Sequence, residues 1–208
     1  MNFYFKRFFI LISLIFLCSG LMAEEGELQL NFGGGAFFPL SLKTEDKTVL
    51  VFASWNAGMN IYFGLTDELD IGTQVTFTML SDASRKAEFL NMQGTEYFNY
   101  WRVQHLVLLR YNLFPGLFFS PHVIAGGGYK VETFEKWDFY GETGKINNYS
   151  KSDYVSANGV VAVGIDLQFR VWEWFIISTQ TLYKWSPDDH SFDLNLFLGA
   201  TFFVNYYR

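Results

Sequence analysis

The chain has 208 residues, a length typical of one domain, with 20% aromatic but only 17% charged side chains. Its formal net charge of -6 excludes the basic surface that nucleic-acid-binding proteins use. So many aromatic rings and so few charges also argue against a freely soluble monomer.

The first 23 residues have the pattern of a secretory signal peptide. Lys6 and Arg7 form a positive start, and residues 8–17 (FFILISLIFL) form a short apolar core. Ala23 supplies the small residue before the expected cleavage point. The apolar core is too short for a membrane-spanning helix, which needs about 20 residues. The single cysteine, Cys18, lies in this segment, and its acylation, which would make a lipoprotein, is the alternative.

After this segment, apolar and polar residues alternate with a period of two, the pattern of β-strands that have two different faces. The alternation is clear in four stretches and weaker in four more. In chain order, the eight predicted strands are 27–38, 51–63, 69–79, 98–112, 117–132, 155–169, 175–185 and 192–205. They are longer than the 5–6 residues of an average globular strand and suit tilted strands that cross a membrane.

The predicted connections alternate between short turns and polar loops, a pattern typical of outer-membrane barrels. The expected turns are 64–68, 113–116 and 170–174, and the expected loops are 39–49, 80–97, 133–153 and the shorter 186–191. Aromatic residues near both sets of connections would form two interfacial belts, and they include Tyr62, Trp172, Phe37, Tyr100, Trp101 and Trp185. We therefore predict an all-β fold: a signal peptide over 1–23, then an eight-stranded antiparallel up-and-down transmembrane β-barrel over 24–208.

The glycine-rich stretch IAGGGYKV, residues 124–131, has two interpretations. A phosphate-binding loop is excluded, because a valine replaces the third glycine of G-x-G-x-x-G and GETGK is one residue short of the P-loop spacing. On a barrel strand, Gly126 and Gly128 face the lumen, and the preceding hairpin is expected to place them opposite Tyr100, Arg102 or Gln104. We expect them to leave room for an arginine in an interior that is only just wide enough for side chains.

Charged residues also fall on inward positions of the predicted strands. They are Arg102, Arg110, Asp70, Asp166 and Asp193. Unpaired charges in so narrow an interior would be costly, so we predict that these residues pair with one another and plug the lumen. Arg102 is expected to reach Asp166 or Asp70.

The signal pattern, the eight alternating strands and the phrases IAGGGY, GVVAVGIDLQF and LNLFLGATF resemble the small bacterial outer-membrane β-barrels of the OmpA/OmpX/OmpW type. The resemblance covers the whole chain after the signal peptide. It implies residence in the outer membrane, contact with outer-membrane lipid and insertion by the outer-membrane assembly machinery. We expect a filled or very narrow lumen, and a structural, adhesive or small-solute channel role with an extracellular ligand at the loops.

An enzyme of this class would need a serine activated by a histidine that an acid orients. Of the three histidines, His105 falls on the lipid face and His190 in the polar loop SPDDHSF, while His122 faces the lumen near Ser120. These positions predict no catalytic, cofactor-binding or metal site. The alternatives are a membrane-embedded acyl hydrolase or transferase, and a soluble periplasmic lipocalin-like binding protein.

Overall fold

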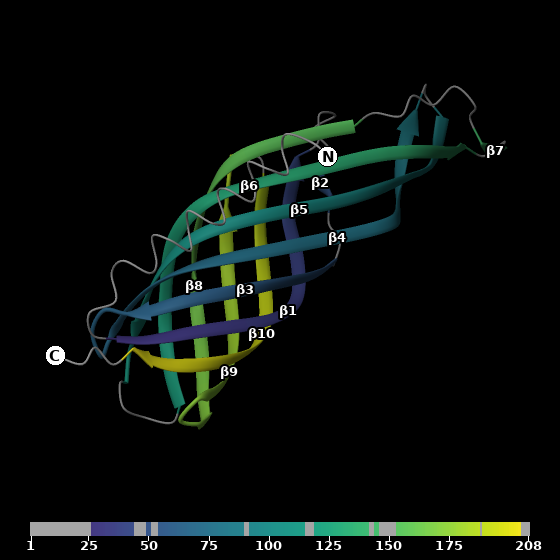
Figure 1. The fold of residues 1–208 in the computed structure, drawn as a ribbon. Helices are drawn as coiled ribbons and strands as arrows, with labels where there is room; N and C mark the ends of the chain where they lie inside the picture. Colours follow the sequence, from purple (N-terminus) through teal and green to yellow (C-terminus); the bar gives the residue numbers. More distant parts are fainter. Residues whose placement is uncertain are drawn as a thin grey trace, which may run out of the picture.

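In the computed structural model, the chain forms a closed antiparallel β-barrel (Figure 1). The structure describes residues 26–43, 49–50, 54–89, 92–114, 119–141, 144–145, 153–187 and 189–204. The expected signal peptide over 1–23 lies outside the described residues and stays a prediction, as does the domain boundary that follows it.

Among the described residues, eight long strands form the wall of the barrel. They are β1 (Gly26–Lys43), β3 (Ser54–Gly64), β4 (Leu69–Phe89), β5 (Met92–Asn112), β6 (Phe119–Gly141), β8 (Asp153–Trp172), β9 (Phe175–Trp185) and β10 (Asp189–Val204). The two-residue strands β2 (Val49–Leu50) and β7 (Gly144–Lys145) pair with β1 and β6. Each long strand pairs antiparallel with the next, and β1 pairs with β10 to close the barrel. The predicted fold class is confirmed.

No helix in the described parts of the chain is long and apolar enough to cross a membrane.

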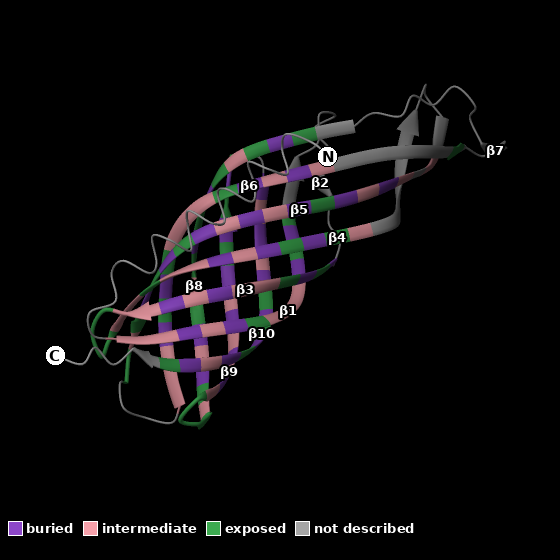
Figure 2. Cartoon of the chain, viewed as in Figure 1, coloured by how far each residue is buried: buried purple, intermediate pink, exposed green. Residues whose placement is uncertain are grey.

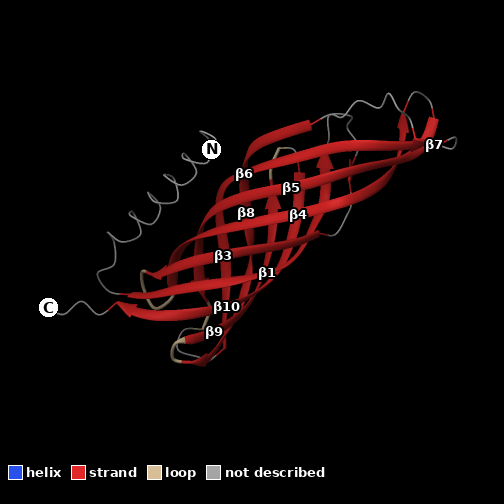
Figure 3. Cartoon of the chain, turned by 45° about the vertical axis from the view of Figure 1, so that its right-hand side comes forward, coloured by secondary structure: helices blue, strands red, loops and turns tan. Residues whose placement is uncertain are grey.

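The wall of the barrel is much taller on one side than on the other. β4, β5 and β6 have 21, 21 and 23 residues, whereas β3 and β9 have 11 each. Figure 3 shows β4, β5 and β6 continuing together well beyond the other strands at one end. The predicted loops 80–97 and 133–153 are therefore wrong over most of their length, since β4 and β5 pair as far as Phe89↔Met92 and β6 runs to Gly141. These segments are rich in polar residues, so the contrast between faces that marks a strand is weak there.

Along each strand, exposed and buried residues alternate, as the bands in Figure 2 show. Large apolar side chains point outward; Trp55 is 80% exposed and Phe32 is 61% exposed. The inward side chains are largely amides, hydroxyls and charged groups, and most of them are buried. An apolar exterior around a polar interior is the reverse of a soluble barrel and is the arrangement of a barrel in lipid.

Exposed aromatic side chains lie at both ends of the barrel wall. Trp172 and Trp174 stack at one end, with their ring centroids 5.6 Å apart. On β5, Tyr111 is 51% exposed near that end and Trp101 is 37% exposed toward the other. The ten residue steps from Trp101 to Tyr111 span about 25 Å at ~3.4 Å per residue and a tilt of ~40°, the height of the apolar band of such barrels.

Three aromatic residues predicted for the belts lie inside the barrel instead. Phe37, Tyr62 and Tyr100 are at most 1% exposed. Each lies at an inward position of its strand, so proximity to a turn or loop does not decide which face a ring occupies.

Candidate functional site

The barrel has two distinct ends, which we name by their connections. The turn end carries the short connections 65–68 and 173–174, and the loop end carries the connection between β9 and β10. Because side chains alternate along every strand, all eight long strands send side chains into the lumen between these ends. Two layers of buried ion pairs lie there, one near each end.

The layer near the turn end is built around Arg110 of β5, which is 1% exposed. Its Nε donates to Asp70 Oδ2 at 2.7 Å, and its Nη1 donates to Asp166 Oδ2 at 3.2 Å. Its Nη2 donates to Gln29 Oε1 at 2.7 Å, and the guanidinium carbon lies 4.1 Å from the ring centroid of Tyr62. Five strands therefore meet on one guanidinium, which donates a hydrogen bond from each of its three nitrogens.

A further ion pair lies at the mouth of the turn end. Arg170 Nη2 of β8 donates to both carboxylate oxygens of Glu27 of β1, at 2.5 and 2.8 Å. Gln29 Nε2 donates to Glu27 Oε1 at 3.1 Å, which connects this pair to the Arg110 layer. The side chains of Arg170 and Glu27 are 36% and 21% exposed, so this pair is partly solvated.

The layer near the loop end is built around Arg102 of β5, which is also 1% exposed. Arg102 Nη1 donates to Asp189 Oδ2 at 2.9 Å. Its Nη2 lies 3.1 Å from Gln104 Oε1 and 3.3 Å from Ser191 Oγ. The guanidinium also lies over the ring of Phe37, 4.6 Å from the centroid. This arrangement joins β5 to β10 and β1 across the lumen.

Two lysines complete the loop-end layer. Lys130 Nζ donates to Glu132 Oε1 at 2.8 Å and to Asp189 Oδ2 at 2.9 Å. Lys184 Nζ forms an ion pair with Asp193 Oδ2. Together with Arg102, the lysines match the three carboxylates of this layer, so its formal charges cancel, as buried charges require.

The structure places all five predicted lumen charges inside the barrel but divides them between the two layers. Arg110 contacts Asp70 and Asp166, whereas Asp193 contacts Lys184. The prediction that Arg102 reaches Asp166 or Asp70 is wrong. Arg102 precedes Arg110 by eight residues on β5 and therefore lies closer to the loop end, where its partner is Asp189.

Four charged residues of the loop-end layer were not among the predicted lumen charges. They are Lys130, Glu132, Lys184 and Asp189. Strand alternation could have found the first three, because each shares the inward parity of its strand. Asp189 falls in a segment predicted as a loop, where alternation does not apply.

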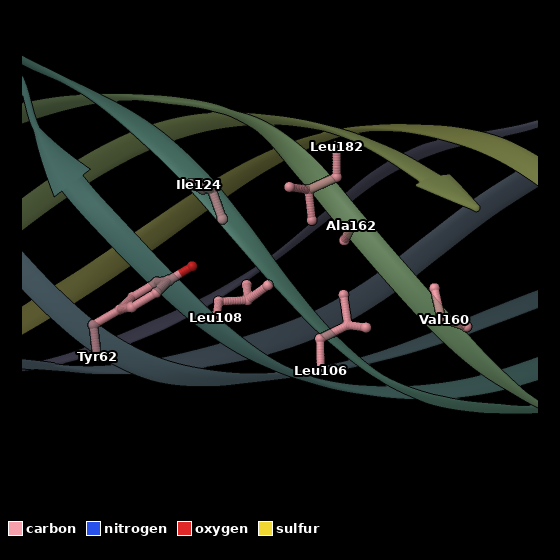
Figure 4. Packing of buried hydrophobic residues seen from close by; sticks show 7 residues of the cluster. All are labelled: Tyr62, Leu106, Leu108, Ile124, Val160, Ala162 and Leu182. Atoms are coloured by element: carbon pink, nitrogen blue, oxygen red, sulfur yellow. The ribbon is translucent and has the colours of Figure 1, made fainter. Parts of the chain in front are cut away.

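Between the two layers lies an apolar cluster inside the barrel, which Figure 4 shows from close by. Its members are Tyr62, Leu106, Leu108, Ile124, Val160, Ala162 and Leu182, all at most 4% exposed. The lumen is therefore filled along its length, with this apolar cluster and buried amides such as Gln74 between the two charged layers.

The glycines of β6 face this cluster and not an arginine. Gly126 pairs with Leu108 and Gly128 with Leu106, so the predicted pairing with residues 100–104 is wrong. The hairpin closes at Asn112↔His122, which places the turn later than predicted and shifts the register. A Cβ added at Gly126 or Gly128 would lie 2.9 Å from the Cα of the leucine opposite. These glycines leave room for the neighbouring strand and its leucine.

His122 lies in the lumen and His190 near the loop end. His122 is 3% exposed and lies opposite Asp166, but the Asp166 carboxylate accepts a hydrogen bond from Arg110. His190 lies at the start of β10 and not in a loop, with its Nδ1 2.8 Å from the Tyr183 hydroxyl. In the ranges that the structure describes, no three His, Cys, Asp or Glu side chains are grouped to hold a metal ion.

No family model matches the chain, and no curated protein matches its sequence. Solved structures match it over most of its length. Ail, the attachment invasion locus protein of Yersinia pestis, is 16% identical with a TM-score of 0.51, over 86% of this chain and 99% of that chain.

OprG, an outer membrane protein from Pseudomonas aeruginosa, is 13% identical with a TM-score of 0.52, over 86% of this chain and 96% of that chain. A major outer membrane protein from Thermus thermophilus is 10% identical with a TM-score of 0.54, over 84% and 99%. At these identities, the likeness bears on the fold alone. The chain has the fold of the small eight-stranded β-barrels of bacterial outer membranes.

Proposed function

We propose that the protein is a closed outer-membrane barrel that acts at the cell surface as a structural and binding protein. In this proposal it is neither an open pore nor an enzyme. The observation that carries it is the filled lumen: Arg102 and Arg110, each 1% exposed, hold two layers of ion pairs across the interior.

Opening the lumen would separate buried charges from their partners. An eight-stranded barrel has an interior only just wide enough for side chains. A water-filled path through it would therefore require the paired charged side chains of both layers to move apart. Breaking one buried ion pair typically costs about 3–5 kcal/mol. Both layers and the apolar cluster between them would have to rearrange, which favours a closed resting state.

The tall side of the wall is the part suited to binding. β8 first pairs with β9 at Val161↔Trp185, so from Asp153 to Val160 its described pairing is with β6 alone. Trp101 marks the loop-end aromatic level on β5, and its row of pairs continues through Thr133 of β6 to Val155 of β8, so the start of β8 reaches this level. An edge of this kind offers backbone N–H and C=O groups to an added strand. The ligand class that we propose is an extended polypeptide segment.

Planar-bilayer recordings of the purified protein test the closed lumen. We expect at most a small conductance. Replacing Arg102 and Asp189 together by serine should raise it, because that removes the pair that crosses the loop end. A large, stable conductance of the unchanged protein would overturn the proposal in favour of a channel.

Peptides selected from a displayed library on whole cells test the edge of β8. Along this strand, successive backbone N–H groups point alternately to β6 and to the free edge. Of the changes Ser156→Pro and Ala157→Pro, one should therefore abolish peptide binding with little loss of stability, and the other should weaken folding. Selected peptides that bind both folded variants unchanged would exclude strand addition at this edge.

A further inference from the structure

The outward face of the barrel carries a polar cluster away from its ends, formed by Thr73 of β4, His105 of β5 and Tyr129 of β6. Thr73 Oγ1 lies 2.6 Å from His105 Nε2 and donates to the backbone oxygen of Leu106 at 3.2 Å. The rings of His105 and Tyr129 have centroids 5.5 Å apart. On the same face of β5, Val107 is 49% exposed, so the cluster lies within the apolar surface.

The hydrogen bonds of this cluster leave one acceptor and one donor unused. The Thr73 hydroxyl donates its proton to the backbone oxygen of Leu106. Its contact with His105 is therefore a hydrogen bond in which Nε2 donates to the Thr73 oxygen. A neutral imidazole then keeps Nδ1 as an acceptor. Neither this Nδ1 nor the Tyr129 hydroxyl has a hydrogen bond to any residue that the structure describes.

The position of His105 makes these unused groups costly. On β5, His105 lies four residues from Trp101 and six from Tyr111, between the two aromatic levels. Lipid tails have no hydrogen-bonding groups, and polar side chains at this depth are rare and usually functional. A second protein surface can supply the missing partners where a lipid tail cannot.

The surface beside the cluster includes several small residues. Gly159 of β8 lies directly opposite Tyr129, and Gly127 and Ala125 share the same outer face of β6. A Cβ added at Gly159 would meet only the Gly128 oxygen, at 4.0 Å. On β10, in contrast, the outer face carries large apolar side chains that suit lipid: Leu194, Leu196, Leu198 and Phe202, each 44–53% exposed.

We propose that this outer surface, made of His105, Tyr129, Gly127 and Gly159, binds a second copy of the same chain. A two-fold axis normal to the membrane sets Tyr129 of each copy against His105 of the other, and each phenol O–H donates to the facing Nδ1. A patch that carries both a donor and its acceptor is complementary to itself, which a two-fold interface requires. The glycines let the two walls approach closely. The inference rests on the membrane placement proposed above.

Chemical crosslinking of introduced cysteines, with the full chain in membranes, tests this interface. The one cysteine of the sequence, Cys18, lies in the expected signal peptide. After cleavage of this peptide, an introduced cysteine is the one thiol that can be crosslinked. Gly159 lies one strand further from the axis than Tyr129, so a bismaleimide that bridges two thiols across the interface should link Gly159→Cys as a dimer, whereas Leu196→Cys on β10 should stay monomeric. Absence of a dimer from Gly159→Cys, or equal dimer from both variants, would overturn the inference. Release of the protein from membranes without detergent would instead contradict the membrane placement itself.

A second change separates the hydrogen bonds from simple proximity. In the Gly159→Cys background, Tyr129→Phe should lower the crosslinked fraction about tenfold, because two symmetric hydrogen bonds are lost. Tyr183→Phe is the matched control, since Tyr183 also faces outward but bonds His190, and it should leave the fraction unchanged. Heat-modifiable gel migration checks that every variant is folded. If Tyr129→Phe releases a co-purified lipid and leaves crosslinking unaltered, a lipid occupies the site and the inference is wrong.

Discussion

Arg102 of β5 and Asp189 of β10 form a 2.9 Å ion pair between strands that lie four places apart in either direction around the barrel. The pair therefore spans the full width of the lumen, and both side chains are 2% exposed. Lys130 of β6 holds the same carboxylate at 2.9 Å. The β9–β10 turn is thus tied to the opposite wall, and the loop end is closed across its diameter.

Arg102→Met and Asp189→Leu should be strongly coupled. Each change alone leaves a buried charge without its partner, whereas the double change removes both charges. The double variant should be less destabilised than the sum of the singles, with a coupling free energy of about 0.5–3 kcal/mol. Urea unfolding in lipid vesicles measures the stability of the unchanged protein, the two single variants and the double variant, which together form a double-mutant cycle. Simple additivity would show that the pair contributes no interaction of its own.

Arg110→Met should cost more stability than Arg170→Met. Arg110 is fully buried between Asp70 and Asp166, so its removal leaves two carboxylates in the lumen, an effect of about 3–5 kcal/mol on the free energy of unfolding. Arg170 pairs with Glu27 at a partly solvated mouth, where exposed pairs contribute about 0–1 kcal/mol. Equal losses in urea unfolding would contradict the division into a buried layer and a solvated pair.

Gly128→Ala and Gly159→Ala should differ in effect although both glycines lie in paired strands. At Gly128, the new methyl group would lie 2.9 Å from the Cα of Leu106, and overpacking of this kind typically costs about 1–3 kcal/mol. At Gly159, the methyl group would enter open space on the outer face. Thermal unfolding followed by circular dichroism compares the stability of the two variants. A larger loss of stability for Gly159→Ala would contradict the assignment of Gly128 to the inner face and Gly159 to the outer face.

Backbone amides of residues 153–160 should exchange with solvent faster than those of residues 175–185. In the described structure the first segment pairs only with β6, so about half of its amides point away from a neighbouring strand. The second pairs with β8 and β10 on its two sides. Hydrogen–deuterium exchange with mass spectrometry resolves these segments, and equal protection would show that another part of the chain covers the β8 edge.

The facing of side chains could be predicted from the sequence, but their partners could not. Alternation is local, so Arg110 and Asp166 are correctly placed inward from their own strands alone. Partners depend on register, and a turn that lies later than 113–116 moves Gly126 from Arg102 to Leu108. The extra length of β4, β5 and β6 could not be predicted from the sequence for another reason. Beyond the lipid level neither face needs to be apolar, so residues 80–97 do not show the contrast that identifies a strand.

The seam between β1 and β10 joins the two ends of the chain, from Gly26↔Val204 to Leu42↔Asp189. The paired residues are further apart in the sequence than those of any other strand pair, so seam closure should be the slow last step of folding, and seam opening the first step of unfolding. Midway along this seam β1 has three successive glycines, residues 33–35, which add no side chains to hold it. The hydrogen bond from Arg110 to Gln29 holds β1 from inside the barrel. It should therefore slow the opening of the seam and lower the unfolding rate of the protein.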